Sequence, residues 1–460
     1  MTNSVHNKRN ILPKQKNAFN SFQRETVNSF NELTEYRTKM KKVLTFTTAL
    51  GAILLSANAN AAGFHLREQS AAAQGSAYAG ASAGAEDNSY AYYNAAGLTR
   101  QKGTQITLGG TYIAPKATAK HVRDKEGTRD ADVQNVVHAA VSPNITVSHQ
   151  INDKWFIGIA GNSPFGMITK YDRDWIGRDH GITSDVKTAT FTPMVAYKAT
   201  DKLSFGAGAQ IQYLWAHLTS GASTKGVGMT RQDGNDLAMG YQLGAMYELS
   251  DRTRFGVGYR SEIRHKIKGN MHASPSEYGP GVDALLNQKI KVELDTPAMF
   301  SLGAYHDINE RWSIMAEYQR VFWSSFQDLT FVSRYGDKNR PGADFIASVS
   351  EKWRDTNFYA VGTSVMLDEQ WKLRLGLAYD QSAVKLEHRT PRIPDSDRFW
   401  MSAGLGYHYN EHLDFNLAYT YIAARKARLD TSLTGNDGYH VMANYHNSIQ
   451  AFAFGLSYKF

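Results

Sequence analysis

The sequence predicts an all-β fold: a 14-stranded antiparallel transmembrane β-barrel plugged by an N-terminal hatch. Three observations lead to this prediction: strands of alternating hydrophobicity, a tight polar turn that recurs six times, and an N-terminal export signal. In the last ten residues, AFAFGLSYKF, apolar side chains occupy every second position: Phe452, Phe454, Leu456, Tyr458 and Phe460. A period of two is typical of a strand with one apolar face.

The alternation continues along the chain. In 203–215 and 371–380 one face is apolar, and in the second stretch the other face carries Lys372, Arg374 and Asp380. Charged side chains in a membrane barrel point to a polar lumen, so the apolar faces are predicted to contact lipid. Aromatic residues stand near the starts of these strands, where an interfacial girdle is expected: Trp155, Phe205, Phe255, Trp312, Trp371 and Phe415.

Short polar turns give the number of strands. They are INDKW (151–155), ATDKL (199–203), LSDRT (249–253), INERW (308–312), LDEQW (367–371) and YNEHL (409–413). Six turns join twelve strands, one strand at about 104–118 precedes them and pairs through a loop with 136–149, and one at 446–460 follows. Between the turns lie longer polar segments such as 220–236 and 270–288. Residues 103–460 are therefore predicted to form a barrel of fourteen strands. Because this number is even, both termini are predicted to lie on the periplasmic side.

The N-terminus carries the export signal. Residues 40–61 begin with Lys41 and Lys42, continue with an apolar stretch and close on Ala59-Asn60-Ala61, the pattern of a secretory signal peptide. The apolar run is shorter than the roughly 20 residues of a membrane helix. Residues 1–39 are interpreted as a non-structural extension from an early start assignment, with the mature chain beginning at Ala62.

Composition excludes several classes of function. The chain has 0 cysteines, so it has no disulfide and no thiol nucleophile. Its 51 Lys and Arg residues are scattered among 43 acidic residues, which argues against a nucleic-acid partner. No metal or cofactor motif is found, and no cofactor is expected. His446 and Ser448 share one face of a strand, but no neighbouring motif supports a catalytic triad, so the protein is not expected to be an enzyme.

Residues 62–102 lack the alternation. This segment is dense in Ala, Gly and Ser. Fourteen strands enclose more space than their own side chains fill, since filling stops near eight strands. From the residues alone, two interpretations remain open: a plug that folds into the lumen, or a disordered periplasmic tail.

The segment AGFHLREQSAAAQGSAYAGASAGAEDNSYAYYNAAGL (62–98) resembles the N-terminal hatch of the long-chain fatty-acid transporter (FadL-type) family, which includes aromatic-hydrocarbon porins. GNSPFGMITKY (161–171), TPMVAYK (192–198), GVGYRSEIRHKIKG (256–269) and IPDSDRFWMSAG (393–404) extend the resemblance over the mature chain. It implies a hatch that starts at Gly63 and Phe64 and closes on Asn94, Ala95, Ala96, Gly97 and Leu98. Ala95 stands where the family motif usually has proline.

Prolines mark a defect in the predicted wall. Pro143, Pro164 and Pro193 fall in the second, third and fourth strands, although proline cannot donate to a strand ladder. An ordinary bulge at a strand end is the alternative. The family resemblance implies an inward kink with a lateral opening in the third strand, formed by Gly161, Asn162, Pro164, Phe165 and Gly166.

The resemblance implies passive uptake of hydrophobic compounds, long-chain fatty acids first, by capture at extracellular loops, a lumen pocket gated by the hatch, and lateral exit. A neutral aromatic-hydrocarbon channel and then a general diffusion porin are the alternatives. The basic positions of fatty-acid transporters fall near Ser220 and Val349, which are not basic. Other candidate partners for a ligand carboxylate are therefore Lys352, Arg354, Arg260 and Lys268.

The remaining expectations concern location and partners. The protein is expected in the bacterial outer membrane as a monomer, among outer-membrane lipids and lipopolysaccharide. Its partner molecule is a hydrophobic fatty acid or hydrocarbon. An aromatic C-terminal residue, Phe460, resembles the signal that outer-membrane assembly machinery reads.

Overall fold

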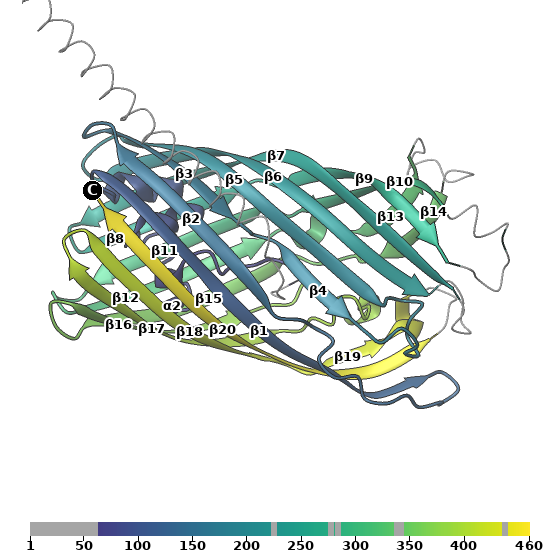
Figure 1. Ribbon diagram of the computed structural model, residues 1–460. Coiled ribbons are helices and arrows are strands. Elements are labelled where there is room, and N and C mark those ends of the chain that lie inside the picture. The colour runs from purple at the N-terminus through teal and green to yellow at the C-terminus, as the bar shows by residue number, and fades with distance from the viewer. Residues whose placement is uncertain (1–62, 222–227, 275–279, 281–286, 335–344, 435–439) are drawn as a thin grey trace, which may run out of the picture. The chain divides into compact units, whose positions relative to one another are not determined.

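The computed structural model describes residues 63–221, 228–274, 280, 287–334, 345–434 and 440–460. The predicted extension 1–39 and the signal peptide 40–61 lie outside these residues. From Gly63 onward the chain forms a closed ring of antiparallel strands, in which β1 (Thr104–Asp124) pairs with both β2 (Ala140–Gln150) and β20 (Val441–Lys459) (Figure 1). The described part of the ring has fourteen spans, which confirms the predicted barrel.

Eight spans are single strands. Besides β1, β2 and β20, these are β5 (Thr183–Lys198), β6 (Leu203–Gly221), β7 (Met229–Ser250), β16 (Trp371–Asp380) and β17 (Arg398–Asn410). The second strand therefore begins four residues later than 136, and β1 continues past 118. Parts of the predicted loops 220–236 and 270–288 are also strand, because Thr230 on β7 pairs with Ala273 on β9.

Six spans consist of two successive strands. They are β3 (Trp155–Asn162) with β4 (Gly166–Lys170), β8 (Thr253–Arg260) with β9 (Ile263–Ala273), β10 (Gln288–Thr296) with β11 (Met299–Asp307), β12 (Trp312–Val321) with β13 (Asp328–Ser333), β14 (Phe345–Ser350) with β15 (Thr356–Met366), and β18 (Leu413–Ala424) with β19 (Ala427–Asp430). Three short 3-10 helices lie in the connections of the described barrel: η3 (Trp323–Ser325) between β12 and β13, η4 (Leu386–His388) between β16 and β17, and η5 (Thr431–Thr434) after β19.

All six predicted turns are present, and the second residue of each motif stabilises its turn. Asn309, for example, accepts hydrogen bonds at its Oδ1 from the backbone N–H groups of Arg311 and Trp312, both at 2.9 Å. The same position is filled by Asn152, Thr200, Ser250, Asp368 and Asn410, each of which accepts from a backbone N–H two residues later. Short polar side chains favour turns for this reason.

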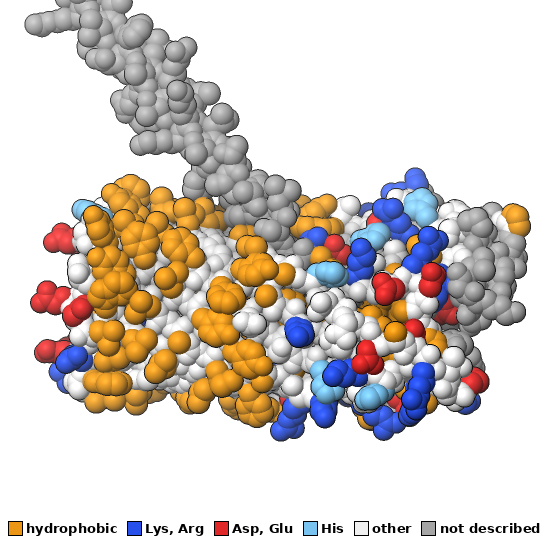
Figure 2. All heavy atoms as spheres, turned by 60° about the horizontal axis from the view of Figure 1, so that its bottom comes forward, with side chains coloured by type: hydrophobic (Ala, Val, Ile, Leu, Met, Phe, Trp, Pro, Cys, Tyr) orange, Lys and Arg blue, Asp and Glu red, His pale blue; other side chains and the backbone are white. Residues whose placement is uncertain are grey.

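The outer face of the barrel carries a hydrophobic band over its turn half, and charged side chains gather beyond the band (Figure 2). The predicted apolar face of β20 points outward, since Phe452 and Phe454 are 48% and 49% exposed. Trp155, Phe205 and Trp312 are also exposed and lie at the starts of their strands. This arrangement is an aromatic girdle at the turn end.

The lumen is filled by residues 63–102, named here the N-terminal segment. It contains α2 (Ala71–Gly75), η1 (Asn88–Tyr92) and η2 (Ala95–Arg100), and Gly63–Leu98 are buried apart from the partly exposed Glu86. Ser70, Asp87 and Asn94 cap the three helices with their side chains. The described chain has no helix that is long and apolar enough to cross a membrane.

Candidate functional site

An apolar pocket lies in the lumen beside the N-terminal segment. Apolar side chains from β4, β5, β6, β9, β10 and β13 converge on it, and Phe64 of the N-terminal segment closes one side. Its cavity volume is only ≈ 60 Å³, so the pocket is a narrow slot. Its apolar lining is Phe64, Met167, Val186, Ala216, Leu218, Ile267, Ile290, Val292, Leu294, Phe326, Leu329, Phe331 and Ile393.

A second cavity of ≈ 270 Å³, named here the outer chamber, adjoins the apolar pocket. The two cavities share Leu218, Leu329, Phe331 and Arg392 among their lining residues. The outer chamber is also lined by Ser220 and Val349, near which the resemblance placed the basic positions of fatty-acid transporters. Together the two cavities form a largely apolar route that ends at Phe64.

Phe64 belongs to an aromatic cluster at the inner end of this route. Its ring centroid lies 4.8 Å from that of Trp323 and 5.8 Å from those of Trp353 and Phe165. Gly63 precedes it with φ +65°, and a Cβ there would lie 2.6 Å from the Trp353 ring. Glycine is therefore required at 63 both by the backbone conformation and by the close approach of the indole.

The third span is interrupted at Pro164, whereas Pro143 and Pro193 lie within β2 and β5. β3 ends at Asn162 and pairs with both β2 and β5, whereas β4 starts at Gly166, forms a ladder with β5 and has only the isolated bridge Val137–Thr169 on its other side. The N-terminal segment bonds to the interruption: Leu66 N–H donates to Pro164 O at 2.7 Å, and Gly166 N–H donates to Phe64 O at 2.8 Å. The predicted kink residues and the first hatch residues are thus in direct contact.

Side chains strengthen this contact. Gln69 donates from Nε2 to the backbone oxygen of Ser163 at 3.0 Å and accepts at Oε1 from Asn162 Nδ2 at 3.2 Å. Thr188 of β5 accepts at Oγ1 from Phe165 N–H and donates to Phe165 O. The interrupted stretch is therefore held between β5 and the N-terminal segment.

Arg392 supplies the positive charge at the junction of the two cavities. It lies in the loop between β16 and β17, and its Nη1 donates to Thr183 O and Ser184 Oγ while Nη2 donates to Thr219 O. Removal from water lowers the pKa of Arg392 to about 10, so the guanidinium stays protonated at neutral pH. Among the residues the structure describes, no carboxylate lies within ion-pair distance of it, but the buried Glu351 lines the same pocket and partly offsets its charge.

The four basic residues proposed from the sequence do not line the apolar pocket. Arg260 is buried against the N-terminal segment, where it donates to Tyr92 O and stacks on the Tyr92 ring. Lys268 and Lys352 are exposed, and Arg354 faces a different cavity at the surface. Sequence reasoning missed Arg392, although it directly precedes the IPDSDRFWMSAG match at 393–404.

The closing residues of the predicted hatch pack against the barrel wall. Asn94 donates from Nδ2 to Ser82 O at 2.7 Å and to Ala245 O on β7 at 2.9 Å. Leu98 packs with Phe156 of β3 in a small apolar cluster that also contains Ala95. Ala95 is the first residue of η2, a position at which proline fits without losing a hydrogen bond, so alanine there keeps the helix start intact.

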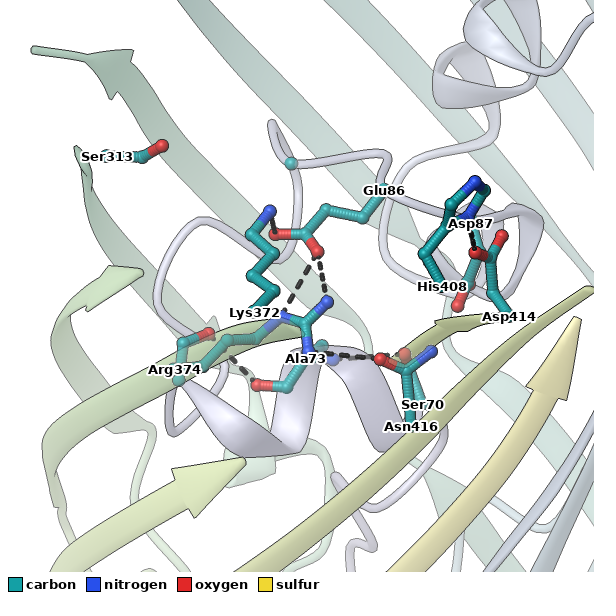
Figure 3. Close-up of polar contacts among 12 residues, drawn as sticks. Ser70, Ala73, Glu86, Asp87, Ser313, Lys372, Arg374, His408, Asp414 and Asn416 are labelled. Carbon is teal, nitrogen blue, oxygen red and sulfur yellow. Dashed lines mark hydrogen bonds and ion pairs between the residues drawn. The ribbon is translucent and has the colours of Figure 1, made fainter. Parts of the chain in front are cut away.

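Ion pairs anchor the N-terminal segment on the turn side of the lumen. Glu86 lies between Arg374 and Lys372 of β16, with N–O distances of 2.6 and 3.0 Å (Figure 3). Arg374 also donates to Asn416 of β18 at 3.0 Å. These groups border a polar cavity of ≈ 600 Å³. The turn end of the lumen is therefore polar, unlike the apolar pocket.

Comparison with known proteins identifies the family. Residues 52–460 match the family described as "Outer membrane protein transport protein (OMPP1/FadL/TodX)". The chain is 27% identical over 450 residues to the long-chain fatty acid transport protein of Escherichia coli K12, covering 90% of this chain and 97% of that one. It is 26% identical to outer membrane protein P1 of Haemophilus influenzae, covering 92% and 100%.

Solved structures share the fold. A FadL homologue from Pseudomonas aeruginosa superposes with a TM-score of 0.78 at 25% identity, covering 87% of this chain and 100% of that one. The toluene transporter TbuX of Ralstonia pickettii superposes with a TM-score of 0.63 at 18% identity, covering 87% and 99%. The chain therefore belongs to the OMPP1/FadL/TodX family of outer membrane transport proteins.

Proposed function

We propose that this protein takes up hydrophobic compounds passively across the outer membrane, with long-chain fatty acids as the preferred cargo and no catalysed reaction. The observation that carries the proposal is Arg392, a protonated guanidinium without an ion-pair partner among the described residues, at the end of an apolar slot. Arg392 is partly buried, and a charge withdrawn from water is costly unless it is paired; Glu351 in the same lining compensates it only at a distance greater than that of an ion pair. A fatty acid satisfies both parts of this site, because its chain is apolar and its carboxylate pairs with arginine.

The route begins at the loop end, which faces the cell exterior in this proposal. Cargo enters the outer chamber, passes Arg392 into the apolar pocket and meets Phe64 at the inner end. Movement of Phe64 and Leu66 breaks the hydrogen bonds Gly166 N–H to Phe64 O and Leu66 N–H to Pro164 O and frees the interrupted third span. The cargo then leaves sideways through the wall, so that its chain does not have to cross periplasmic water.

A neutral aromatic hydrocarbon is the second candidate cargo. The lining of the apolar pocket favours it, and solved structures of the same fold carry the titles toluene transporter TbuX and toluene transporter TodX. A general diffusion porin is the third, and the N-terminal segment packed in the lumen argues against it.

Uptake of labelled oleate and toluene tests the proposal, in cells that lack their own transporter and express the full chain. Arg392→Gln removes a charge-assisted hydrogen bond of about 1.5–3 kcal/mol, so oleate uptake at limiting concentration should fall by about tenfold or more. Arg392→Lys should restore part of it. Lys352→Gln is the matched control, because it removes an exposed cation that does not line the apolar pocket.

The outcomes separate the candidates. Toluene uptake should be unchanged in Arg392→Gln, since toluene has no carboxylate. Equal loss of oleate and toluene uptake would mean that Arg392 acts only through its bonds to Thr183 and Thr219. Uptake of toluene alone by the unmodified protein would assign the hydrocarbon function. Entry of small sugars without either compound would replace the transporter proposal with the porin.

A further inference from the structure

A basic pocket opens on the barrel at the loop end, away from the apolar pocket. It has a volume of ≈ 470 Å³ and lies between the loop 381–397, the start of β15 and the junction of β18 and β19. Its lining has five cationic side chains and two acidic ones, Glu387 and Asp397. The cations that define the basic pocket are Arg354, Lys385, Arg389, Arg425 and Lys426.

Local contacts leave the basic pocket with a surplus of positive charge. Asp397 already accepts hydrogen bonds from the Tyr379 hydroxyl at 2.8 Å and from Ser382 N–H at 3.0 Å, and it lies 3.8 Å from Arg425. Arg354 donates only to a neutral acceptor, the backbone oxygen of Ser382. The two carboxylates of the lining, Glu387 and Asp397, cannot neutralise its five cations, so an external anion would be attracted here.

Arg389 gives a second, independent indication of an absent anion. Its side chain is 8% exposed, Nη1 donates to the backbone oxygen of Arg428, and Nε has no partner in the part of the chain that the structure describes. Burial lowers the pKa of Arg389 more than the nearby carboxylates of Asp395, Glu387 and Asp397 raise it, and the positive charge of Arg354 adds to the lowering. A buried donor without an acceptor is costly, and an anion in the basic pocket would supply one.

The basic pocket lies just beyond a row of aromatic side chains. Tyr359 of β15 pairs in register with Tyr379 of β16, which pairs with Phe399 of β17. Tyr359 and Phe399 are 48% and 47% exposed on the outer wall. Asp397 stands two residues beyond Phe399, which corresponds to about 7 Å along a strand. Exposed aromatic rows mark the membrane–water interface, so the basic pocket is at the level of lipid head groups.

Neighbouring strands continue the basic surface. Lys116 and Lys120 alternate outward on β1 beyond Tyr112, and neither forms an ion pair with any residue that the structure describes. On the wall seen in Figure 2, Lys, Arg and His side chains gather beyond the hydrophobic band, with Asp and Glu side chains among them. A cationic layer directly above an apolar band matches an amphiphile with a phosphorylated head group.

We propose that the basic pocket binds the phosphate groups of the phosphorylated glycolipid in the leaflet that surrounds the loop end. The acyl chains of the lipid lie along the apolar wall below Phe399, and the sugar phosphate enters between Arg354, Arg389 and Arg425. The inference rests on the proposed orientation, with the loop end in the outer leaflet. It assigns Arg354 to an outer lipid and not to the transported cargo.

Lipid binding to the full chain tests this inference, with the protein purified in detergent and freed of bound lipopolysaccharide. The probes are bisphosphorylated lipid A, the same lipid without its phosphates, and inorganic phosphate, each followed by native mass spectrometry. Arg425→Gln with Lys426→Gln is the test variant, since both side chains are exposed and the change should not prevent folding. Lys154→Gln with Lys202→Gln, at the turn end, is the control with the same change of charge.

We expect the unmodified protein to prefer bisphosphorylated over dephosphorylated lipid A, and the test variant to bind it about tenfold more weakly. The control should bind like the unmodified protein. Equal affinity in the test variant, equal loss in the control, or equal binding of the dephosphorylated lipid would each overturn the inference. If inorganic phosphate displaces the lipid at the same concentration, the pocket is a free-phosphate site instead. Arg354→Gln gives a second variant, expected to show the same loss.

Failure of the transport proposal would be visible separately. The Arg425 and Lys426 side chains lie outside the apolar pocket, so the test variant should take up oleate normally. If the unmodified protein takes up no oleate but still prefers bisphosphorylated over dephosphorylated lipid A, only the transport proposal is wrong. If the unmodified protein takes up oleate but binds both forms of lipid A equally, only the lipid-binding inference is wrong.

Discussion

Gly376 of β16 faces the N-terminal segment at a distance that no side chain can occupy. A Cβ on Gly376 would lie 2.0 Å from the backbone oxygen of Ser76, where ordinary contact begins at 3.4 Å. In Gly376→Ala the turn after α2 must therefore retreat by about 1.4 Å, the difference between these distances. Overpacking of this kind costs about 1–3 kcal/mol.

Hydrogen exchange measures that cost locally. The Ala77 and Ala79 N–H groups donate to Gln74 O and Ser76 O, and opening of this turn exposes them. A loss of about 1–3 kcal/mol in the free energy of local opening speeds exchange about 5–150-fold. Mass-spectrometric exchange of peptides covering 70–80 in the detergent-solubilised protein gives this ratio directly.

Gly110→Ala is the matched control. Gly110 is also a strand glycine, on β1, but the nearest atom to its Cβ would be 3.6 Å away. Exchange in 70–80 should stay within about twofold of the unmodified protein in this variant, because no contact is compressed. Unchanged exchange in Gly376→Ala, or the same increase in Gly110→Ala, would refute the idea that wall glycines fix the position of the N-terminal segment.

Two other changes address how the segment is held. Glu86→Gln removes the counter-ion of Arg374 and Lys372, whose charges the polar cavity screens only partly. We therefore expect the free energy needed to displace the N-terminal segment to fall by about 1–3 kcal/mol. Faster cleavage of the segment by an added protease measures this change. Cleavage at the rate of the unmodified protein would show that the ion pairs contribute little. Phe64→Ala deletes a ring packed on Trp323 at 4.8 Å, and the Leu66 and Gly166 amides should then exchange faster while the β1–β20 ladder is unaffected. Equal acceleration in both places would indicate general unfolding of the barrel.

Much of the barrel can be predicted from the sequence because its determinants are local. Each turn depends on one polar side chain bonding to backbone two or three residues away, as Asn309 does. Each strand face depends on alternation within about ten residues, as between Phe452 and Phe460. The number of spans follows from these two patterns alone, and the structure agrees with it.

The candidate site depends on contacts that local patterns do not contain. Arg392 reaches Thr183 and Thr219, which are 209 and 173 residues away in the chain. Arg260 looked available as a ligand partner, but the N-terminal segment covers it through Tyr92. Periodicity gives the side of the strand on which a residue lies, and only closure of the ring decides what it meets across the lumen.

The sequence by itself determined the class of barrel, its turns and its girdle, and it marked Pro164 as a position that a strand ladder does not favour, because these follow from backbone bonding and burial over short distances. Tertiary structure decided that Phe64 and Leu66 bond to Gly166 and Pro164 and that Arg392, not a strand lysine, carries the positive charge beside the apolar pocket. The physical reason is that a closed barrel brings residues from opposite ends of the chain into one lumen, where burial selects their partners.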